Sequence, residues 1–546
     1  MLSFADARKH ATDIVEVTAR RQMPPWLPAP GEVAFLGERR LSEAQIETIR
    51  QWVAGGANEG DPARTPPIPA WPQGDWHFGP PDLIVRMPAP YIVPAGGRDI
   101  YRHFILPMKL DRRRFVAAWE FRPRSRTVHH AFLRFDRTGE ARRRDVLDPE
   151  PGFPGMDTPE GLNSPGGHFA SWQPGAAPRR NRPGLVWALE PGADVVIQMH
   201  LQPQGKPEPL EAEIGFYFTD TPPTNEPVKV ALNSYAIDIP AGSTNTVATD
   251  EYLLPADADL LGVLPHTHYL GRRIEVRALL PDKSEKVLLL IPEWDFRWQG
   301  DYQLREPLGL PAGTRVTMRV SFDNSPRNPF NPSSPPQRVQ FGLNTTDEMA
   351  EAWLQLLPRN AAGSARYAES GRNRISRDVL AYNQQRLRIN PKDGVAMVNL
   401  ARGLLVQNRV PEARQQLQQA VEVAPDLAEA HYYLGIVHRM TGNRAAALAE
   451  FQRAVQLNPA HGKAHGNLGL LWVERNRLTE AAAEFEAALR VDGTDTLALG
   501  LLGAIRLQQG QVGPALTLLT KAAELDPDDA DIKANLHLAR QRQRTP

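Results

Sequence analysis

The sequence predicts a multidomain protein in which a short helical N-terminal segment precedes two antiparallel β-sandwich domains and an all-α repeat solenoid. Its 546 residues are too many for one hydrophobic core. Between residues 82 and 357, short runs of alternating apolar and polar side chains are separated by Pro and Gly, which is typical of antiparallel sheets. After Pro358 the pattern repeats every 34 residues, which indicates stacked helical units.

Residues 1–60 are expected to be helical. Ser42 precedes an apolar stripe, and Gln45 lies three residues after Ser42. This spacing is the capping-box pattern of a helix start. Gly55 predicts the end of that helix. Residues 61–81 are rich in proline and predict a linker.

The strand-rich region is long enough for two sandwiches, which are predicted at residues 82–222 and 223–357. In residues 212–218 and 315–322 every second side chain is apolar, so one face of each strand is expected to be buried. The polar, proline-rich residues 218–230 interrupt the alternation and predict the boundary between the two sandwiches.

Residues 391–546 predict helical repeats, preceded by a linker and a helix at residues 358–390. Small residues recur at one phase of each 34-residue unit, and large apolar residues recur at another. This pattern resembles the tetratricopeptide repeat. The resemblance implies four repeat units whose concave surface binds an extended peptide or a partner protein. The residues that end successive units at the same phase are Pro391, Pro425, Pro459, Gly493 and Pro527.

Composition narrows the classes of function. Lys+Arg and Asp+Glu are equal at 63 each, so net charge predicts no nucleic-acid partner. The longest apolar run, residues 287–291, is too short to predict a membrane span. Cysteine is absent, which excludes disulfides, thiolate ligands, cysteine nucleophiles and covalent c-type haem attachment. Any metal must therefore be held by His, Met, Asp or Glu.

Closely spaced histidines are the candidate metal ligands, because imidazole suits copper, zinc, iron and nickel. His266 and His268 are two residues apart, so on a strand both rings point to one face and can reach one ion. His129 and His130 are adjacent, so they converge only if a twist or β-bulge turns one of them. His200 ends a predicted strand. Each feature taken singly is also typical of structural histidines that bind no metal.

The order of these motifs along the chain is more informative than any one of them. It runs from the paired histidines through Gln-Met-His and His-Thr-His to Met349. This order resembles the copper type II, ascorbate-dependent monooxygenases, the family of peptidylglycine α-hydroxylating monooxygenase and dopamine β-monooxygenase. The resemblance implies two jelly-roll-like sandwiches, two copper ions, O₂, and an external reductant such as ascorbate or a cytochrome.

The resemblance also implies a role for each ligand. The copper site for electron transfer would consist of His129, His130 and His200. The catalytic site, at which O₂ is activated and a substrate C–H bond is hydroxylated, would consist of His266, His268 and Met349. A soft thioether such as that of Met349 suits copper, because it favours the reduced ion.

Other positions depart from the peptide-amidating members of this family. Leu264 stands where those enzymes carry an arginine that binds the peptide carboxylate, and Glu351 and Trp353 follow Met349. A peptide ending in glycine is therefore not the expected substrate, and the sequence identifies no particular small molecule or peptide in its place. His168 matches no ligand position and is expected to be structural or to support the ligands.

The stretch "ARRQMPPWL" and the helix after it resemble the end of a class I cytochrome c domain, in which Met23 would be the axial haem ligand. Such domains precede copper monooxygenase modules in some bacterial chains. Because the haem-attachment cysteines are missing, we expect a cytochrome c-like remnant without haem, or a true start that lies upstream. The resemblance implies a periplasmic or exported protein, although the N-terminus as written predicts no signal peptide.

Three hypotheses for function follow. The first is a copper-dependent monooxygenase with a repeat domain that docks a partner protein. The second is a catalytically inactive copper-binding or protein-interaction scaffold. The third is a mononuclear zinc or iron site, against which Met349 argues because neither metal favours a thioether ligand. The complete ligand set favours the enzyme.

Overall fold

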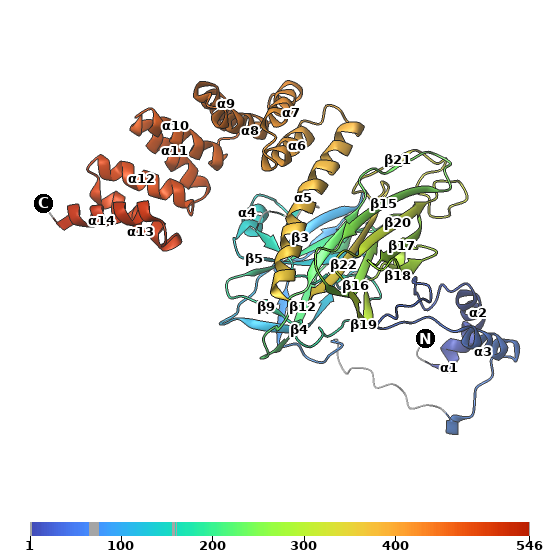
Figure 1. The fold of residues 1–546 in the computed structure, drawn as a ribbon. Coiled ribbons are helices and arrows are strands. Elements are labelled where there is room, and N and C mark those ends of the chain that lie inside the picture. The colour runs from blue at the N-terminus through green and yellow to red at the C-terminus, as the bar shows by residue number, and fades with distance from the viewer. Residues whose placement is uncertain (1–2, 65–75, 156–158, 160, 545–546) are drawn as a thin grey trace. The chain divides into compact units, whose positions relative to one another are not determined.

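The computed structural model describes residues 3–64, 76–155, 159 and 161–544 (Figure 1). The chain divides into two compact units, Met1–Arg372 and Asn373–Pro546. Part of the predicted linker, residues 65–75, lies outside the described residues. Of the helices that the structure describes, none combines the length and the apolar character needed to cross a bilayer.

Three helices open the first unit, α1 (Phe4–Lys9), α2 (Ala11–Ala19) and α3 (Glu43–Ala54). The capping box predicted for α3 is present, because the Gln45 N–H donates to the Ser42 hydroxyl at 3.2 Å and the Ser42 N–H donates to the Gln45 side chain at 2.8 Å. Gly55 follows the last helical residue, as predicted. The chain between α2 and α3 bonds to a later strand, since the Leu36 N–H donates to the Gln303 carbonyl at 2.8 Å.

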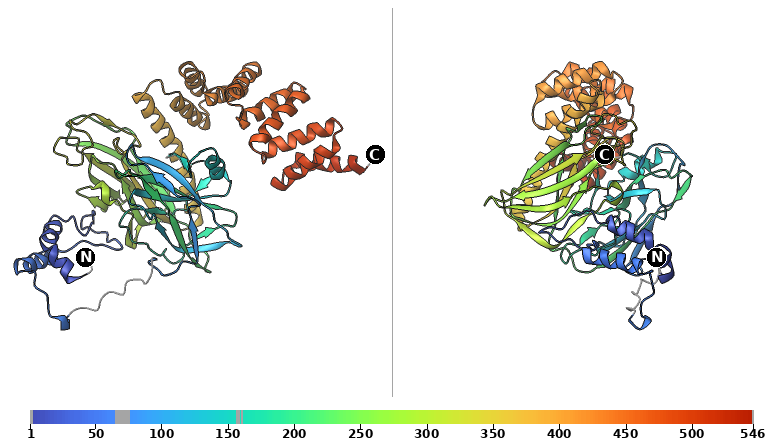
Figure 2. Two further views of the ribbon diagram at one scale, coloured as in Figure 1. Left: turned by 180° about the vertical axis from the view of Figure 1, so that it is seen from behind. Right: turned by 90° about the vertical axis from the view of Figure 1, so that its right-hand side faces the viewer.

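Antiparallel sheets make up most of this unit, which confirms the predicted strand-rich region (Figure 2). One four-stranded sheet has the order β1 (Leu83–Arg86), β12 (Glu213–Thr219), β4 (Arg114–Arg122), β9 (Trp187–Leu189). A six-stranded sheet has the order β6 (Phe153–Pro154), β3 (Ile100–Leu106), β10 (Asp194–Leu201), β5 (Val128–Asp136), β7 (Leu162–Asn163), with β8 (Ser171–Trp172) also beside β5. A ribbon pairs β2 (Tyr91–Val93) with β11 (Glu208–Leu210), and the short helix α4 (Glu140–Val146) follows β5. One hydrophobic core joins the two larger sheets, with Phe121 and Phe216 from the first and Leu133 and Ile197 from the second.

The later strands form a separate set of sheets. One has the order β13 (Val228–Asn233), β22 (Glu351–Pro358), β16 (Ala258–His266), β19 (Tyr302–Leu310). Another has the order β15 (Thr246–Leu253), β20 (Arg315–Phe322), β17 (Gly271–Leu279), β18 (Glu285–Ile291), and a ribbon pairs β14 (Asp238–Ile239) with β21 (Val339–Gln340). In β20 every second side chain is buried, as predicted. Among the named strands, none that ends by Thr219 shares a sheet with one that begins at Val228 or later.

The second unit is a stack of helix pairs, which confirms the predicted repeats (Figures 1 and 2). The long helix α5 (Ala361–Ile389) leads into it. The pairs are α6 (Gly394–Val406) with α7 (Val410–Val423), α8 (Ala428–Met440) with α9 (Arg444–Leu457), α10 (Gly462–Glu474) with α11 (Leu478–Val491), and α12 (Thr496–Gln508) with α13 (Val512–Leu525). Helix α14 (Ala530–Arg544) follows the last pair.

A small residue in the first helix of a pair meets a large one in the second. A Cβ atom built on Gly435 would lie 2.6 Å from the Phe451 ring, and one built on Gly469 would lie 2.6 Å from the Phe485 ring. Both rings are fully buried. The close approach of the helices therefore depends on glycine at this phase of the repeat, because any side chain would displace the aromatic ring.

We predict that Gly469→Ala lowers the free energy of unfolding by about 1–3 kcal/mol, which is typical of overpacking. Gly466→Ala is the matched control on the same helix, because a Cβ atom there meets nothing within 4 Å. Alanine at position 466 should instead stabilise the helix by about 0.5–1 kcal/mol. Urea denaturation followed by far-UV circular dichroism measures both variants, and equal shifts would contradict this account of the packing.

Candidate metal centre

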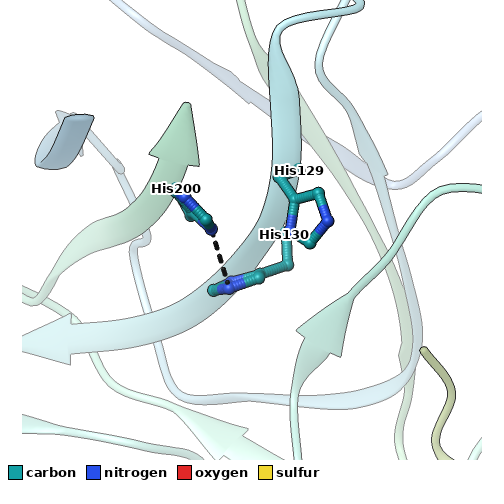
Figure 3. Close-up of side chains that lie close together, drawn as sticks. All are labelled: His129, His130 and His200. Carbon is teal, nitrogen blue, oxygen red and sulfur yellow. Dashed lines mark hydrogen bonds between the residues drawn. The ribbon is translucent and has the colours of Figure 1, made fainter. Parts of the chain in front are cut away.

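A β-bulge brings together the three histidines predicted for the first metal site. Strand β10 pairs with β5 so that His200 lies opposite His130, but the next residue of β10, Leu201, lies opposite Val128. His129 is thus the extra residue of a bulge, as the adjacent pair required. The nitrogen ligand atoms of the three histidines all lie within 4.8 Å of one another, and Figure 3 shows the rings gathered between the two strands.

The surroundings of this triad leave ring nitrogens available. Nδ1 of His200 and Nε2 of His130 are 3.1 Å apart, and Nε2 of His200 lies 3.1 Å from a carboxylate oxygen of Asp99. His129 stacks on Phe296, with ring centroids 4.4 Å apart. Nδ1 of His129 and Nδ1 of His130 are buried, and neither has a hydrogen-bond partner among the described residues. Buried polar atoms without partners are rare unless an unseen ligand satisfies them.

Burial keeps these rings in the neutral form. It lowers the pKa of His129 to about 3, and it also lowers the pKa values of His130 and His200. The Asp99 carboxylate opposes the effect at His200, because a nearby negative charge favours imidazolium. A neutral imidazole keeps a lone pair free to bind a metal ion.

His266 and His268 converge by a different route from the one predicted. Strand β16 ends at His266, and His268 lies in the segment that leads into the turn at residues 269–270, so the two residues do not share one regular strand. Their rings nevertheless lie 5.2 Å apart between centroids. Nδ1 of His266 is 2.6 Å from Oε1 of Gln299, and Nδ1 of His268 is 3.1 Å from the carbonyl oxygen of Asp347.

Glu348 holds this turn against the segment that carries Met349. Its side chain is fully buried and accepts four hydrogen bonds at 2.6–3.0 Å. The donors are the Thr267 hydroxyl and the backbone N–H groups of His268, Leu270 and Met349. Burial raises the pKa of Glu348 to about 7. Sequence reasoning missed this residue, although an acidic side chain directly before a predicted ligand is a signal that could have drawn attention to it.

The two predicted ligand sets adjoin one cavity of about 290 Å³. His130, His200, His266, His268 and Met349 line it, and Met349 is only 9% exposed. The ring centroids of His130 and His266 are 6.2 Å apart, so the five imidazoles form one continuous cluster with His129 at its edge.

The other positions singled out in the sequence lie near this cavity or away from it. Leu264, Glu351 and Trp353 line it. His168 instead lines a neighbouring cavity of about 640 Å³, and burial lowers its pKa to about 4. Met23, the residue that resembles a haem ligand, is 44% exposed.

Comparison with known proteins identifies the repeats. The sequence profile of the tetratricopeptide repeat family matches residues 398–461, 441–498 and 467–530. The crystal structure of MamA is 22% identical, and the match covers 27% of this chain and 86% of that chain with a TM-score of 0.25. The crystal structure of YrrB, described as a TPR protein with an unusual peptide-binding site, is 22% identical over 33% of this chain and 89% of that chain, also with a TM-score of 0.25. No match was found among curated protein sequences.

Proposed function

We propose that this chain is a copper-dependent monooxygenase that docks a partner protein through its tetratricopeptide repeats. The observation that carries the proposal is the convergence of His129, His130 and His200 within 4.8 Å. The second predicted set, His266, His268 and Met349, lines the adjoining cavity. Histidines more than 130 residues apart in sequence thus meet at one place, which a purely structural role for each would not require.

The donor set fits copper. The unpartnered Nδ1 atoms of His129 and His130 would be satisfied by a metal ion, and their neutral state suits ligation. Imidazoles together with a thioether suit copper, whereas zinc has no use for the sulfur of Met349. When bound, copper supplies one-electron redox chemistry and the activation of O₂.

The protein's own groups orient the proposed ligands. Asp99, Gln299 and the carbonyl of Asp347 each lie within hydrogen-bond distance of one ligand imidazole. Partners of this kind set the tautomer and the orientation of a metal-bound histidine and raise its basicity. Glu348 keeps His268 and Met349 beside each other, because it bonds to the backbone of both.

In this proposal the strand-rich unit consists of two jelly-roll-like sandwiches, residues 82–222 and 223–357. The two separate sets of sheets support this division. The first sandwich would contribute His129, His130 and His200, and the second would contribute His266, His268 and Met349. A periplasmic or exported location and an external reductant such as ascorbate or a cytochrome remain part of the proposal through the family resemblance.

Metal analysis and oxygen uptake test the proposal on the full-length protein. We predict about two copper ions per chain, falling towards one in His200→Ala, in His266→Ala and in Met349→Ala. His10→Ala is the control, because the His10 side chain is 49% exposed and belongs to no cluster proposed here. Copper-loaded protein should consume O₂ in the presence of ascorbate. Zinc as the only bound metal would support the mononuclear site instead.

A second candidate is an inactive copper-binding or protein-interaction scaffold. The observation that favours it is the family match, which lies within the repeat unit and therefore concerns protein binding and not catalysis. Copper uptake without ascorbate-dependent oxygen consumption would support this candidate over the enzyme.

A further inference from the structure

One wall of the cavity beside the histidines is built from strand β5. His130, Phe132 and Arg134 all line the cavity, and they alternate along the strand. Side chains two residues apart on a strand share a face. This wall therefore presents a candidate metal ligand, then an aromatic ring, then a cation.

The sheet of β13, β22 and β16 repeats this order on the other wall. His266 lies opposite Glu351, and Leu264 lies opposite Trp353. Two residues further along β22, Gln355 lies opposite Lys229 of β13. Lys229, Trp353 and His266 all line the cavity, so this wall also runs from a ligand through an aromatic ring to a cation. From ligand to cation each wall spans four residues of strand, or about 13 Å.

The two cations lie at one end of the cavity, and no carboxylate among the described residues lines that end. The Arg134 guanidinium donates to the Ser164 hydroxyl at 2.8 Å and to the backbone carbonyl of Leu133. Among the described residues, neither Arg134 nor Lys229 forms an ion pair with a carboxylate. Burial, together with the positive charge of Arg134, lowers the pKa of Lys229 to about 8. Two partly buried, unpaired cations are unfavourable unless a ligand supplies a negative charge.

The acidic group of the cavity lies at the opposite end. Glu351 is paired with His266 in the sheet register and accepts from the Trp353 indole N–H at 3.2 Å. Trp353 separates it from Lys229 along the wall. The cavity is thus polar along its length, with the histidines and Glu351 at one end and Arg134 and Lys229 at the other.

We propose that this cavity binds an amphipathic organic anion. Its acidic group would lie between Arg134 and Lys229, and its apolar body between Phe132 and Trp353. The end remote from the acid would then face His130 and His266. If this anion is also the substrate, the substrate class is a small organic acid that is hydroxylated away from its acidic group. Only this second step rests on the proposed function. The volume of about 290 Å³ suits a molecule at the lower end of ordinary ligand size.

Isothermal titration calorimetry on metal-free, full-length protein tests this inference. The probes are 3-phenylpropionate and its neutral analogue 3-phenylpropionamide, which differ in charge and hardly in shape. We expect the acid to bind at least about tenfold more tightly than the amide. Lys229→Met and Arg134→Met should each weaken binding of the acid by about tenfold and leave binding of the amide unchanged. Lys206→Met, which removes an exposed lysine, should alter neither.

Several results would overturn the inference. These are equal affinity for acid and amide, no binding of the acid at millimolar concentration, or acid binding that survives both substitutions. Circular dichroism checks that the variants are folded. If Lys229→Met does not fold, Lys229→Gln replaces it in the titrations. Copper content is measured separately on the same preparations. Acid-selective binding by a protein that takes up no copper would therefore support the anion site while removing the monooxygenase proposal.

Discussion

Gly167→Ala is expected to destabilise the first unit by more than about 3 kcal/mol, the range reserved for severe steric or backbone defects. Gly167 has a φ of +64°, a conformation that residues with a Cβ atom rarely adopt. A Cβ atom at this position would overlap the carbonyl group of Pro227. Backbone atoms cannot rotate away as a flexible side chain can, so Pro227 and the start of β13 would have to shift.

The position of Gly167 makes this shift costly. Its carbonyl accepts from the Gln355 side chain of β22 at 3.0 Å, and Gln355 is buried and lines the neighbouring cavity of about 640 Å³. The glycine thus joins the loop before β8 to the sheet that carries Trp353 and His266. We therefore expect loss of stability together with loss of bound metal.

Gly166→Ala is the matched control for this prediction. Gly166 precedes Gly167 directly, but a Cβ atom there meets nothing within 4 Å, so its effect should stay within about 1 kcal/mol. Urea unfolding followed by tryptophan fluorescence reports both variants. Similar midpoints for the two would show that the loop yields easily and that the contact with Pro227 is unimportant.

Glu348→Gln is expected to cost about 1–3 kcal/mol, and Glu348→Ala more than about 3 kcal/mol. The carboxylate accepts from four donors on both of its oxygens. Glutamine has one acceptor oxygen, so at least one buried donor would face an N–H group. Alanine would leave all four donors without their acceptor. Both variants should also lose metal at the His266, His268 and Met349 set, because the turn would no longer be held beside Met349.

Glu306→Gln is the matched control, because it removes the charge of a glutamate that is not buried. Glu306 is exposed on β19, so its replacement should change stability by no more than about 0.5 kcal/mol. Thermal unfolding and copper analysis of the three variants measure the effects. If Glu348→Gln and Glu306→Gln unfold at the same temperature, the hydrogen bonds to Glu348 do not hold the turn.

Much of the architecture was readable from local patterns. The capping box at Ser42, the alternation in β20 and the 34-residue repeat all depend on neighbours a few residues apart, or on one backbone period. The need for a bulge at His129 followed from the same geometry, because adjacent residues of a regular strand face opposite sides. Met349 was predicted as a ligand only from the resemblance to the copper monooxygenases. In the structure it lines the same cavity as His266 and His268.

Local patterns predicted the kinds of element and the candidate metal-binding residues, because backbone periodicity and ligand chemistry are properties of short stretches. The groups that surround those candidate ligands became apparent only in the folded chain. Asp99 beside His200, Glu348 beneath the turn of His268, and Arg134 facing the same cavity as Lys229 are pairings between distant parts of the chain. The physical reason is that sheet register and packing set such contacts, and neither leaves a local pattern in the sequence.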